Sequence, residues 1–343
     1  MKNSADVAII GAGPIGIELA VACQQAGIDF LHLEGSQIGY TISWFAPGTR
    51  FFSSNDRIGI AGVPLVTSWQ EKASREDYLA YLRAVVGQYK LDIHTYHPVV
   101  DFARAADGFT LTTDGLKGRH AWRARRVVLA TGGTARPRML NIPGENLPQV
   151  SHYFQDPHSY FGQRLLVVGG GNSAVEALLR CHRAGARVSL SYRGADLDAR
   201  AIKYWLYPEV RGLLREGAIA GYFNSTIKEI RPGAATLINA AGELVNVDAD
   251  FVLLLTGYEA DMSLCRMAGV ELRQPGNVPV FNPRTMETNV PGVYVAGTAI
   301  AGTQSHYRIF LENCHVHVKE IVAALRGDAP PAVAAPSFEQ PET

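Results

Sequence analysis

The sequence predicts an α/β protein made of two Rossmann-like, three-layer dinucleotide-binding domains, the second inserted in the first. Two glycine-rich loops carry this prediction. Gly11–Gly16 follows the apolar run at residues 7–10, and Gly169–Ala174 follows the apolar run at residues 165–168. Each loop stands between a strand-like and a helix-like segment. One such loop is weak evidence, but two imply that one chain binds two nucleotides.

The first loop belongs to a strand, glycine turn, helix and strand that cover residues 5–34 and end at Glu34. Residues 75–89 have apolar side chains at helical spacing, and residues 126–133 predict a buried strand that ends in a glycine turn. Residues 134–163 are rich in proline and turn residues, which indicates a crossing between domains.

The second loop belongs to a strand–loop–helix–strand unit at residues 165–193, and another buried strand covers 250–257. A strand at 293–297 and a helix at about 309–326 resemble the completion of the N-terminal domain. We therefore expect a discontinuous first domain at 1–153 and 259–328, a second domain at 154–258, and a disordered tail at 329–343.

Composition and cysteine spacing exclude several kinds of partner, targeting segment and metal site. Lys+Arg and Asp+Glu each number 32, so the net charge gives no support for nucleic acid or an anionic membrane as a partner. The apolar stretch after residue 6 contains spaced glycines and Glu18, which fits a phosphate loop better than a signal peptide. Four isolated cysteines form no C-x-x-C pair, so we expect no metal site and a reducing, cytoplasmic location.

The residues around each loop assign its nucleotide. Glycines permit the tight turn and the close approach of backbone to a pyrophosphate, which then faces the helix N-terminus. Glu34 ends the strand after the first loop, and a carboxylate there binds ribose hydroxyls and repels a 2′-phosphate. Arg193 ends the corresponding second strand, with Arg200 and Lys203 downstream. The first site therefore suits FAD, and the second suits NADPH better than NADH.

The arrangement of loops and strand ends resembles the two-dinucleotide flavoprotein reductases of thioredoxin-reductase type. Over about residues 5–326 it resembles the bacillithiol disulfide reductase family in more detail. The matching blocks, in order, are 51–54 (FFSS), 62–64 (GVP), 142–145 (IPGE), 150–154 (VSHYF), 169–176, 202–205 (IKYW), 256–258 (TGY) and 309–313 (IFLEN).

The loops and this resemblance together imply two sets of cofactor-binding residues. The expected FAD set is Gly11, Gly13, Pro14, Ile15, Gly16, Glu34, Gly35, Thr41, Phe52, Ser54, Thr131, Gly132, Gly297, Thr298 and Ile309. The expected NADPH set is Gly169, Gly171, Asn172, Ser173, Ala174, Arg193, Lys203 and Gly257. The resemblance also places His306 and Tyr307 near the flavin ring, with a helix that begins there and faces flavin O2.

Two positions depart from related patterns. Many flavoproteins of this superfold have an aspartate where this chain has Thr298, whose hydroxyl can make the same hydrogen bond. The disulfide reductase family also tends to lack that aspartate. The cysteine proposed to attack the disulfide in that family lies inside the first loop, where this chain has Ile15. The remaining catalytic candidates are His306, Tyr307 and Cys314.

The leading hypothesis is an NADPH-dependent FAD oxidoreductase that resembles a disulfide reductase. Its acceptor would be a small-molecule disulfide or a small redox protein, and the family resemblance suggests a homodimer or larger homo-oligomer. The alternatives are a ferredoxin/flavodoxin-NADP reductase-like activity, a flavin-dependent monooxygenase, and a non-catalytic FAD/NADPH redox sensor. The absence of a dithiol motif favours direct transfer from flavin to acceptor.

Overall fold

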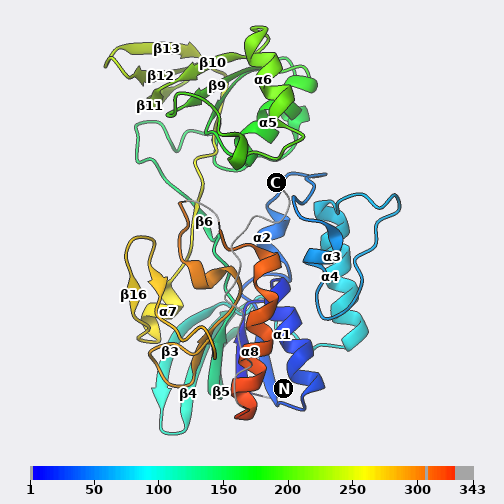
Figure 1. Ribbon diagram of the computed structural model, residues 1–343. Coiled ribbons are helices and arrows are strands. Elements are labelled where there is room, and N and C mark those ends of the chain that lie inside the picture. The colour runs from blue at the N-terminus through cyan, green and yellow to red at the C-terminus, as the bar shows by residue number, and fades with distance from the viewer. Residues whose placement is uncertain (1–2, 306–307, 329–343) are drawn as a thin grey trace. The chain divides into compact units, whose positions relative to one another are not determined.

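The protein, seen in a computed structural model that describes residues 3–305 and 308–328, divides into two compact units (Figure 1). Unit 1 contains the residues up to Ser43, Gly48–Arg136 and the residues from Glu259 on. Unit 2 contains Trp44–Pro47 and Pro137–Tyr258. The predicted fold class, two α/β units with the second inserted in the first, is confirmed.

Unit 1 is built around the first glycine loop. Its helices, 3₁₀ helices (η) and strands are β1 (Ser4–Ile10), α1 (Pro14–Gln25), β2 (Phe30–Leu33), α2 (Tyr40–Ser43), α3 (Asn55–Ile58), α4 (Arg75–Tyr89), β3 (Val99–Ala105), β4 (Gly108–Gly115), β5 (Gly118–Leu129), β6 (Arg136–Pro137), β15 (Tyr258–Glu259), α7 (Ser263–Met267), β16 (Leu272–Arg273), β17 (Val278–Pro279), β18 (Val293–Val295), η3 (Gly297–Ala301), η4 (Leu311–Asn313) and α8 (His315–Arg326). The short strands β6 and β15, where the chain passes between the units, pair with each other.

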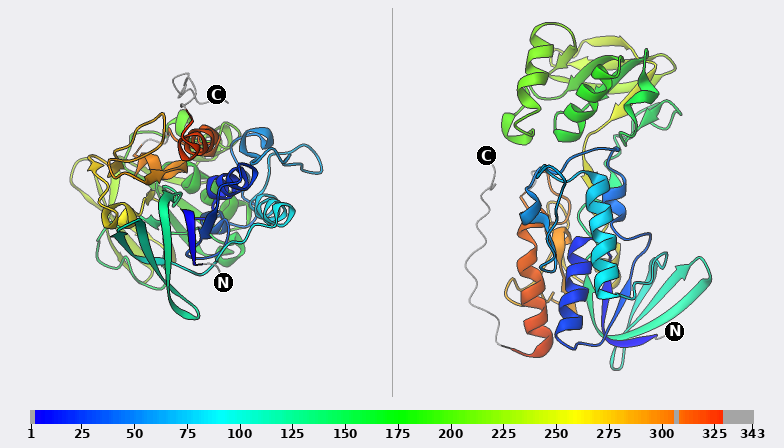
Figure 2. Two further views of the ribbon diagram at one scale, coloured as in Figure 1. Left: turned by 90° about the horizontal axis from the view of Figure 1, so that it is seen from below. Right: turned by 90° about the vertical axis from the view of Figure 1, so that its right-hand side faces the viewer.

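The first sheet joins parallel and antiparallel strands through the long strand β5. Strands β2, β1 and β18 run parallel to their neighbours, and β3 and β4 form an antiparallel ribbon with the first half of β5. Helices α1 and α8 lie side by side on one face of the parallel strands (Figures 1 and 2), where Val7, Ile9, Leu19, Val128 and Ile321 share a buried cluster. The resulting order of layers is helix, parallel sheet and antiparallel ribbon.

Unit 2 repeats this plan around the second loop. Its elements are β7 (Val150–Ser151), η1 (Pro157–Tyr160), β8 (Arg164–Val168), α5 (Asn172–Arg183), β9 (Arg187–Tyr192), η2 (Ala199–Ala201), α6 (Tyr207–Arg215), β10 (Ala220–Phe223), β11 (Ser225–Arg231), β12 (Ala234–Asn239), β13 (Leu244–Asp248) and β14 (Phe251–Leu254). The parallel sheet has the order β10-β9-β8-β14-β7, and β11-β12-β13 form a separate antiparallel sheet.

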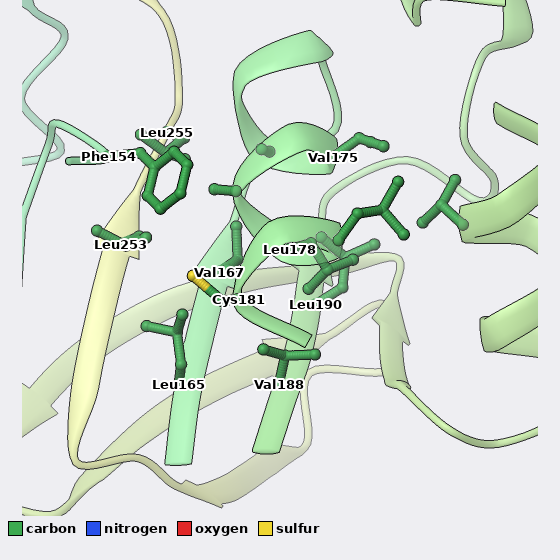
Figure 3. Packing of buried hydrophobic residues seen from close by; sticks show 14 of the residues in the cluster. Phe154, Leu165, Val167, Val175, Leu178, Cys181, Val188, Leu190, Leu253 and Leu255 are labelled. Atoms are coloured by element: carbon green, nitrogen blue, oxygen red, sulfur yellow. The ribbon is translucent and has the colours of Figure 1, made fainter. Parts of the chain in front are cut away.

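Apolar residues cover both faces of the second parallel sheet. Helix α5 packs on one face through Leu178 and Cys181, which lie among side chains of β8, β9 and β14 (Figure 3). On the other face, Leu166 and Leu254 share a cluster with Leu237 of β12. Strands with two covered faces read as continuous apolar runs, which explains why residues 165–168 and 251–254 were recognisable in the sequence.

Two boundaries differ from the sequence-based expectation. The main segment of unit 2 begins at Pro137, not after residue 153, because β7 pairs with β14 and the backbone at Gly144 packs tightly against Ile230. The final helix begins at His315 and not at about 309, since the Asn313 side chain accepts a hydrogen bond from the Phe310 N–H and closes a separate 3₁₀ turn. The expected tail at 329–343 lies outside the described residues.

Candidate functional site

The first glycine loop combines close backbone contacts with one open position. Gly11 has φ of +108°, and a Cβ there would lie 2.4 Å from the Ala130 carbonyl oxygen. A Cβ on Gly16 would lie 1.9 Å from the Gly11 oxygen, so helix and turn meet without room for a methyl group. A Cβ on Gly13 would meet no atom within 4 Å. The open side of this loop, at Gly13, is where a pyrophosphate can approach the backbone.

The N-terminus of α1 has no side-chain cap. Its N-cap residue is Gly13, and Pro14 occupies the first turn, where its missing N–H costs no hydrogen bond. The free N–H groups of the first turn and the helix dipole therefore favour an anion at this end.

Glu34 is hydrogen-bonded to the same loop. Its Oε2 accepts from the Ala12 N–H at 2.6 Å, and its Oε1 accepts from the Ser36 N–H at 2.8 Å. Burial raises the pKa of Glu34, against the lowering effect of these backbone hydrogen bonds. Each carboxylate oxygen has a second lone pair. The carboxylate can therefore still accept from ribose hydroxyls.

His32 is a structural part of the loop that sequence reasoning missed. The ring is fully buried in β2, and its Nε2 lies 3.0 Å from the Gly11 carbonyl oxygen. Because that oxygen only accepts, Nε2 carries the proton, and burial lowers the ring pKa to about 4. The neutral imidazole therefore holds the turn at Gly11 in place through this hydrogen bond. A lone histidine in an apolar strand gives no sequence signal for this role.

Three separate segments of unit 1 that were expected at the FAD site converge. The Thr298 hydroxyl accepts from the Gly133 N–H at 2.9 Å, next to Gly132, which adopts φ of +78°. The side chain of Ile15 packs against Gly297, where a Cβ would lie 3.4 Å away. Thr131, Gly132, Gly297 and Thr298 therefore lie together at the C-terminal ends of β5 and β18, beside the first loop.

A second group of contacts joins the segments at 51–54 and 309–313. Ser53 donates to Glu312 Oε1 at 2.7 Å, and the buried Ser53 lies between Phe52 and Ser54. The side chain of Gln304 accepts from the Ile309 N–H and donates to its carbonyl oxygen. Thr41 donates to the Thr134 carbonyl at 3.4 Å, which joins α2 to the loop that follows β5. Gly35 is exposed next to Pro98.

The second loop follows the same geometry with one difference. Gly169 has φ of +141°, and a Cβ there would lie 2.3 Å from the Leu255 oxygen. Gly171, the N-cap of α5, has open space, as Gly13 has. Ala174 occupies the position of Gly16, and its Cβ would lie 3.2 Å from one added to Gly169. The two loops therefore fit two dinucleotides by backbone shape alone.

Charges near the second loop only partly match the expected basic cluster. Lys203 is buried, and its Nζ donates to Glu176 Oε2 at 2.8 Å, while its backbone N–H donates to Asn172 Oδ1 at 2.6 Å. Arg200 is exposed and paired with Asp198. Lys203 therefore positions the loop through Asn172, and its charge is already neutralised. Arg193, exposed at the end of β9, has no salt bridge with any other described residue.

The cysteines are buried. Cys23, Cys181 and Cys314 have no exposed surface, and Cys265 is 2% exposed. Burial raises the pKa of Cys23 and Cys181 to about 12 and of Cys265 to about 11, and it raises that of Cys314 further. Cys314 donates its S–H to the Phe310 oxygen at 3.0 Å. A nucleophilic thiol needs the opposite environment, which argues against the role that the sequence allowed for Cys314.

The other two catalytic candidates, His306 and Tyr307, lie outside the described residues. Within residues 3–305 and 308–328, no three side chains of His, Cys, Asp or Glu are grouped so that they could hold a metal ion. No helix in this part of the chain is long and apolar enough to cross a membrane.

Two duplicated α/β units, each with a glycine loop that fits a dinucleotide, define a two-dinucleotide oxidoreductase. The family described as pyridine nucleotide-disulphide oxidoreductase matches residues 8–297. The chain belongs to this family and, within it, to the bacillithiol disulfide reductase family. It is thus an NADPH-dependent flavoprotein oxidoreductase whose cofactors are FAD and NADPH, as the sequence predicted.

Individual proteins of known name are similar to this chain over most of its length. The bacilliredoxin reductase Bdr of Bacillus subtilis is 34% identical over 318 residues, which are 92% of this chain and 96% of that protein. The bacillithiol disulfide reductase Bdr from Bacillus cereus superposes with a TM-score of 0.90 at 33% identity, covering 94% of this chain and 99% of that one. A ferredoxin–NADP reductase of Ignicoccus hospitalis is 25% identical over 302 residues, 85% of this chain and 89% of that protein.

Proposed function

We propose that the protein reduces a low-molecular-weight disulfide with NADPH, through FAD and without a cysteine of its own in the electron path. The reaction balances as NADPH, one proton and a disulfide giving NADP⁺ and two thiols. The observation that carries the proposal is the burial of Cys23, Cys181, Cys265 and Cys314 together with their raised pKa values. None of these thiols forms an appreciable amount of thiolate at neutral pH.

FAD is proposed to bind at the first loop. The N–H groups of the α1 N-terminus would hold its pyrophosphate at Gly13, and Glu34 would accept from its ribose hydroxyls. Thr298 and Gly132 stand where the ends of β5 and β18 meet. Phe52, Ser54 and Ile309 complete the proposed site by resemblance to the family.

NADPH is proposed to bind at the second loop. Gly171 and the α5 N-terminus would hold its pyrophosphate, and Asn172 is fixed for this by the Lys203 N–H. Arg193 would bind the 2′-phosphate, since it is exposed and a guanidinium matches phosphate geometry. When bound, FAD accepts a hydride from NADPH and supplies two electrons to the acceptor.

The decisive experiment combines transient kinetics with thiol removal. Anaerobic stopped-flow mixing should show faster reduction of bound FAD by NADPH than by NADH, and a bacillithiol-type disulfide should restore the oxidised flavin spectrum. A variant with all four cysteines changed to alanine should keep disulfide-dependent NADPH oxidation within about threefold per bound FAD. Loss of turnover in a folded, FAD-loaded variant would show that a protein thiol takes part.

A second function is supported by the relatives named ferredoxin–NADP reductase. At 25% identity they are more distant than the Bdr relatives, yet they cover most of this chain. NADPH-driven reduction of ferredoxin, measured in the same instrument, tests this function. If ferredoxin reoxidises the flavin at least tenfold faster than the disulfide does, the second function replaces the first.

The assembly and location of the protein remain part of the proposal. A homodimer or larger homo-oligomer in the cytoplasm, acting on a small molecule and not on nucleic acid or a membrane, is what the family resemblance supports. Light scattering on the FAD-loaded protein measures the oligomeric state directly. A monomer at micromolar concentration would contradict that part.

A further inference from the structure

His315 bridges two helices and a loop carbonyl within unit 1. It is the first residue of α8, and its Nδ1 lies 2.7 Å from Glu18 Oε2 on α1. Its Nε2 lies 2.9 Å from the carbonyl oxygen of Arg57 on α3. The side chain of His315 is 26% exposed and that of Glu18 is 14% exposed. The ring is therefore largely shielded from water and faces an acceptor at each nitrogen.

This geometry determines the protonation state of the ring. Carboxylate and carbonyl oxygens accept hydrogen bonds and cannot donate them. A neutral imidazole has one N–H, so it would leave one ring lone pair facing an oxygen lone pair at under 3 Å. Only the doubly protonated imidazolium satisfies both contacts.

The surrounding charges agree with a cation at this position. Burial lowers the pKa of His315, but the hydrogen bond to Glu18 and the charges of Glu18 and Glu312 outweigh it, so the pKa is raised from 6.5. The nearby His317 stays neutral, since burial lowers its pKa to about 4. Tyr78 and Tyr81 of α4, which also interact with Glu18, have raised pKa values and are neutral hydroxyls.

Each element that His315 joins is continuous with a part of the proposed FAD site. Helix α1 begins at the first glycine loop, α3 follows Phe52–Ser54 directly, and α8 follows Ile309 and η4. The Ser53–Glu312 hydrogen bond at 2.7 Å is a second link between the segment that precedes α3 and the segment that precedes α8.

We propose that the His315 imidazolium, held by Glu18 and the Arg57 carbonyl, is a positioning residue that keeps three segments of the FAD site in register, so that FAD affinity falls when His315 loses its proton. The inference rests on the proposed placement of FAD at the first loop. It requires no step of catalysis and no assumption about the electron acceptor.

FAD and the imidazolium favour the same arrangement of the three segments, so we expect the pKa of His315 to be higher in the FAD complex than in the free protein. The dissociation constant of FAD should therefore increase as the pH rises through the interval between these two pKa values. That interval lies on the alkaline side of 6.5, because the pKa is already raised without FAD. The dissociation constant should level off once the ring is neutral in both states.

The test measures protonation and FAD affinity separately. In FAD-loaded protein with ¹⁵N-labelled histidine, the His315 ring, assigned with the His315→Gln variant, should show two protonated nitrogens at pH 6.5. His315→Gln should weaken FAD binding on the order of tenfold at pH 6.5 and lose the alkaline dependence. His158→Gln, an exposed histidine of unit 2, is the control and should bind FAD like the wild type.

Glu18→Gln supplies a second variant if His315→Gln does not fold. Its amide oxygen can still accept from Nδ1, but the lost charge should move the FAD affinity transition to lower pH. A neutral His315 ring at pH 6.5, or an unchanged pH transition in Glu18→Gln, would overturn the proposal. These measurements use neither NADPH nor a disulfide, so they stand apart from the outcome of the turnover experiments.

Discussion

Glu34 accepts a hydrogen bond from the Ala12 N–H at 2.6 Å, so the end of β2 and the turn after β1 are fixed to each other. The same carboxylate accepts from Ser36. This links the residue that is proposed to select the ribose with the loop that is proposed to hold the pyrophosphate. A change at Glu34 should therefore affect both parts of the nucleotide.

Glu34→Gln should weaken FAD binding by about tenfold or more. The amide can replace one acceptor oxygen but presents N–H groups to Ser36, and a hydrogen bond to a charged group contributes about 1.5–3 kcal/mol. Quenching of FAD fluorescence on titration with apoprotein gives the dissociation constant. Glu216→Gln, an exposed carboxylate in unit 2, is the matched control. Equal FAD affinities for the two variants would show that the ribose of FAD does not bind at Glu34.

Gly13→Ala and Gly16→Ala should separate ligand binding from folding. The Gly13 position has open space and an ordinary φ of −73°, so the variant should keep its melting temperature but lose at least tenfold in FAD affinity. The Gly16 position would put Cβ 1.9 Å from a backbone oxygen, and such overpacking costs about 1–3 kcal/mol or more. Thermal melts of both apoproteins measure the effect on folding, and titration of Gly13→Ala with FAD measures the effect on binding. An unchanged FAD affinity in Gly13→Ala would contradict the proposed location of the pyrophosphate.

Arg193→Gln should change the preference between the two nicotinamide nucleotides. The KM for NADPH is expected to rise by about 10- to 100-fold, while that for NADH stays within about twofold, because only NADPH carries the 2′-phosphate. Steady-state rates with each nucleotide measure the ratio. Arg200→Gln serves as control, since Arg200 is already paired with Asp198. A similar loss with both nucleotides would place Arg193 elsewhere in the site.

The apoprotein should lose stability as the pH falls from 6.5 towards 4. His317 Nδ1 accepts from the Gly297 N–H and His32 Nε2 donates to Gly11, and burial lowers the pKa of each ring to about 4. The unfolded chain therefore binds about one more proton per histidine in this range, and each proton changes stability by about 1.4 kcal/mol per pH unit.

Urea unfolding at pH 5 and pH 6.5 measures this slope. His317→Gln should reduce it by about one proton, whereas His158→Gln should leave it unchanged. If His317→Gln keeps the full wild-type dependence of stability on pH, then His317 is protonated in the folded protein. Its Nδ1 could then not accept the hydrogen bond from the Gly297 N–H.

Local sequence patterns predicted much of the fold. The helix expected at 75–89 forms as α4 at Arg75–Tyr89, where Ser74 and Asp77 form a capping box. Both glycine loops formed where expected because their signal lies within about ten consecutive residues. The helix expected from 309 failed because Ile309, Phe310 and Leu311 continue the apolar pattern, while the Asn313 side chain closes a separate turn.

Long-range contacts account for the features that the sequence did not reveal. Glu145 accepts from the N–H groups of Leu140 and Asn141, and β7 pairs with β14, so this segment belongs to unit 2 although its prolines suggested a crossing. The contact between His315 and Glu18 spans 297 positions, and neither residue stands in a motif. Pairing of Lys203 with Glu176 likewise depends on the packing of α5.

The third loop position makes exchange between the two duplicated units asymmetric. Glycine at Gly16 is imposed by the Gly11 oxygen, whereas Ala174 is accommodated above Gly169. A glycine in place of Ala174 would therefore meet no steric conflict at this position. An alanine in place of Gly16 would bring its methyl group against the Gly11 carbonyl oxygen. The two loops, although alike in backbone shape, thus tolerate different single substitutions at the same position.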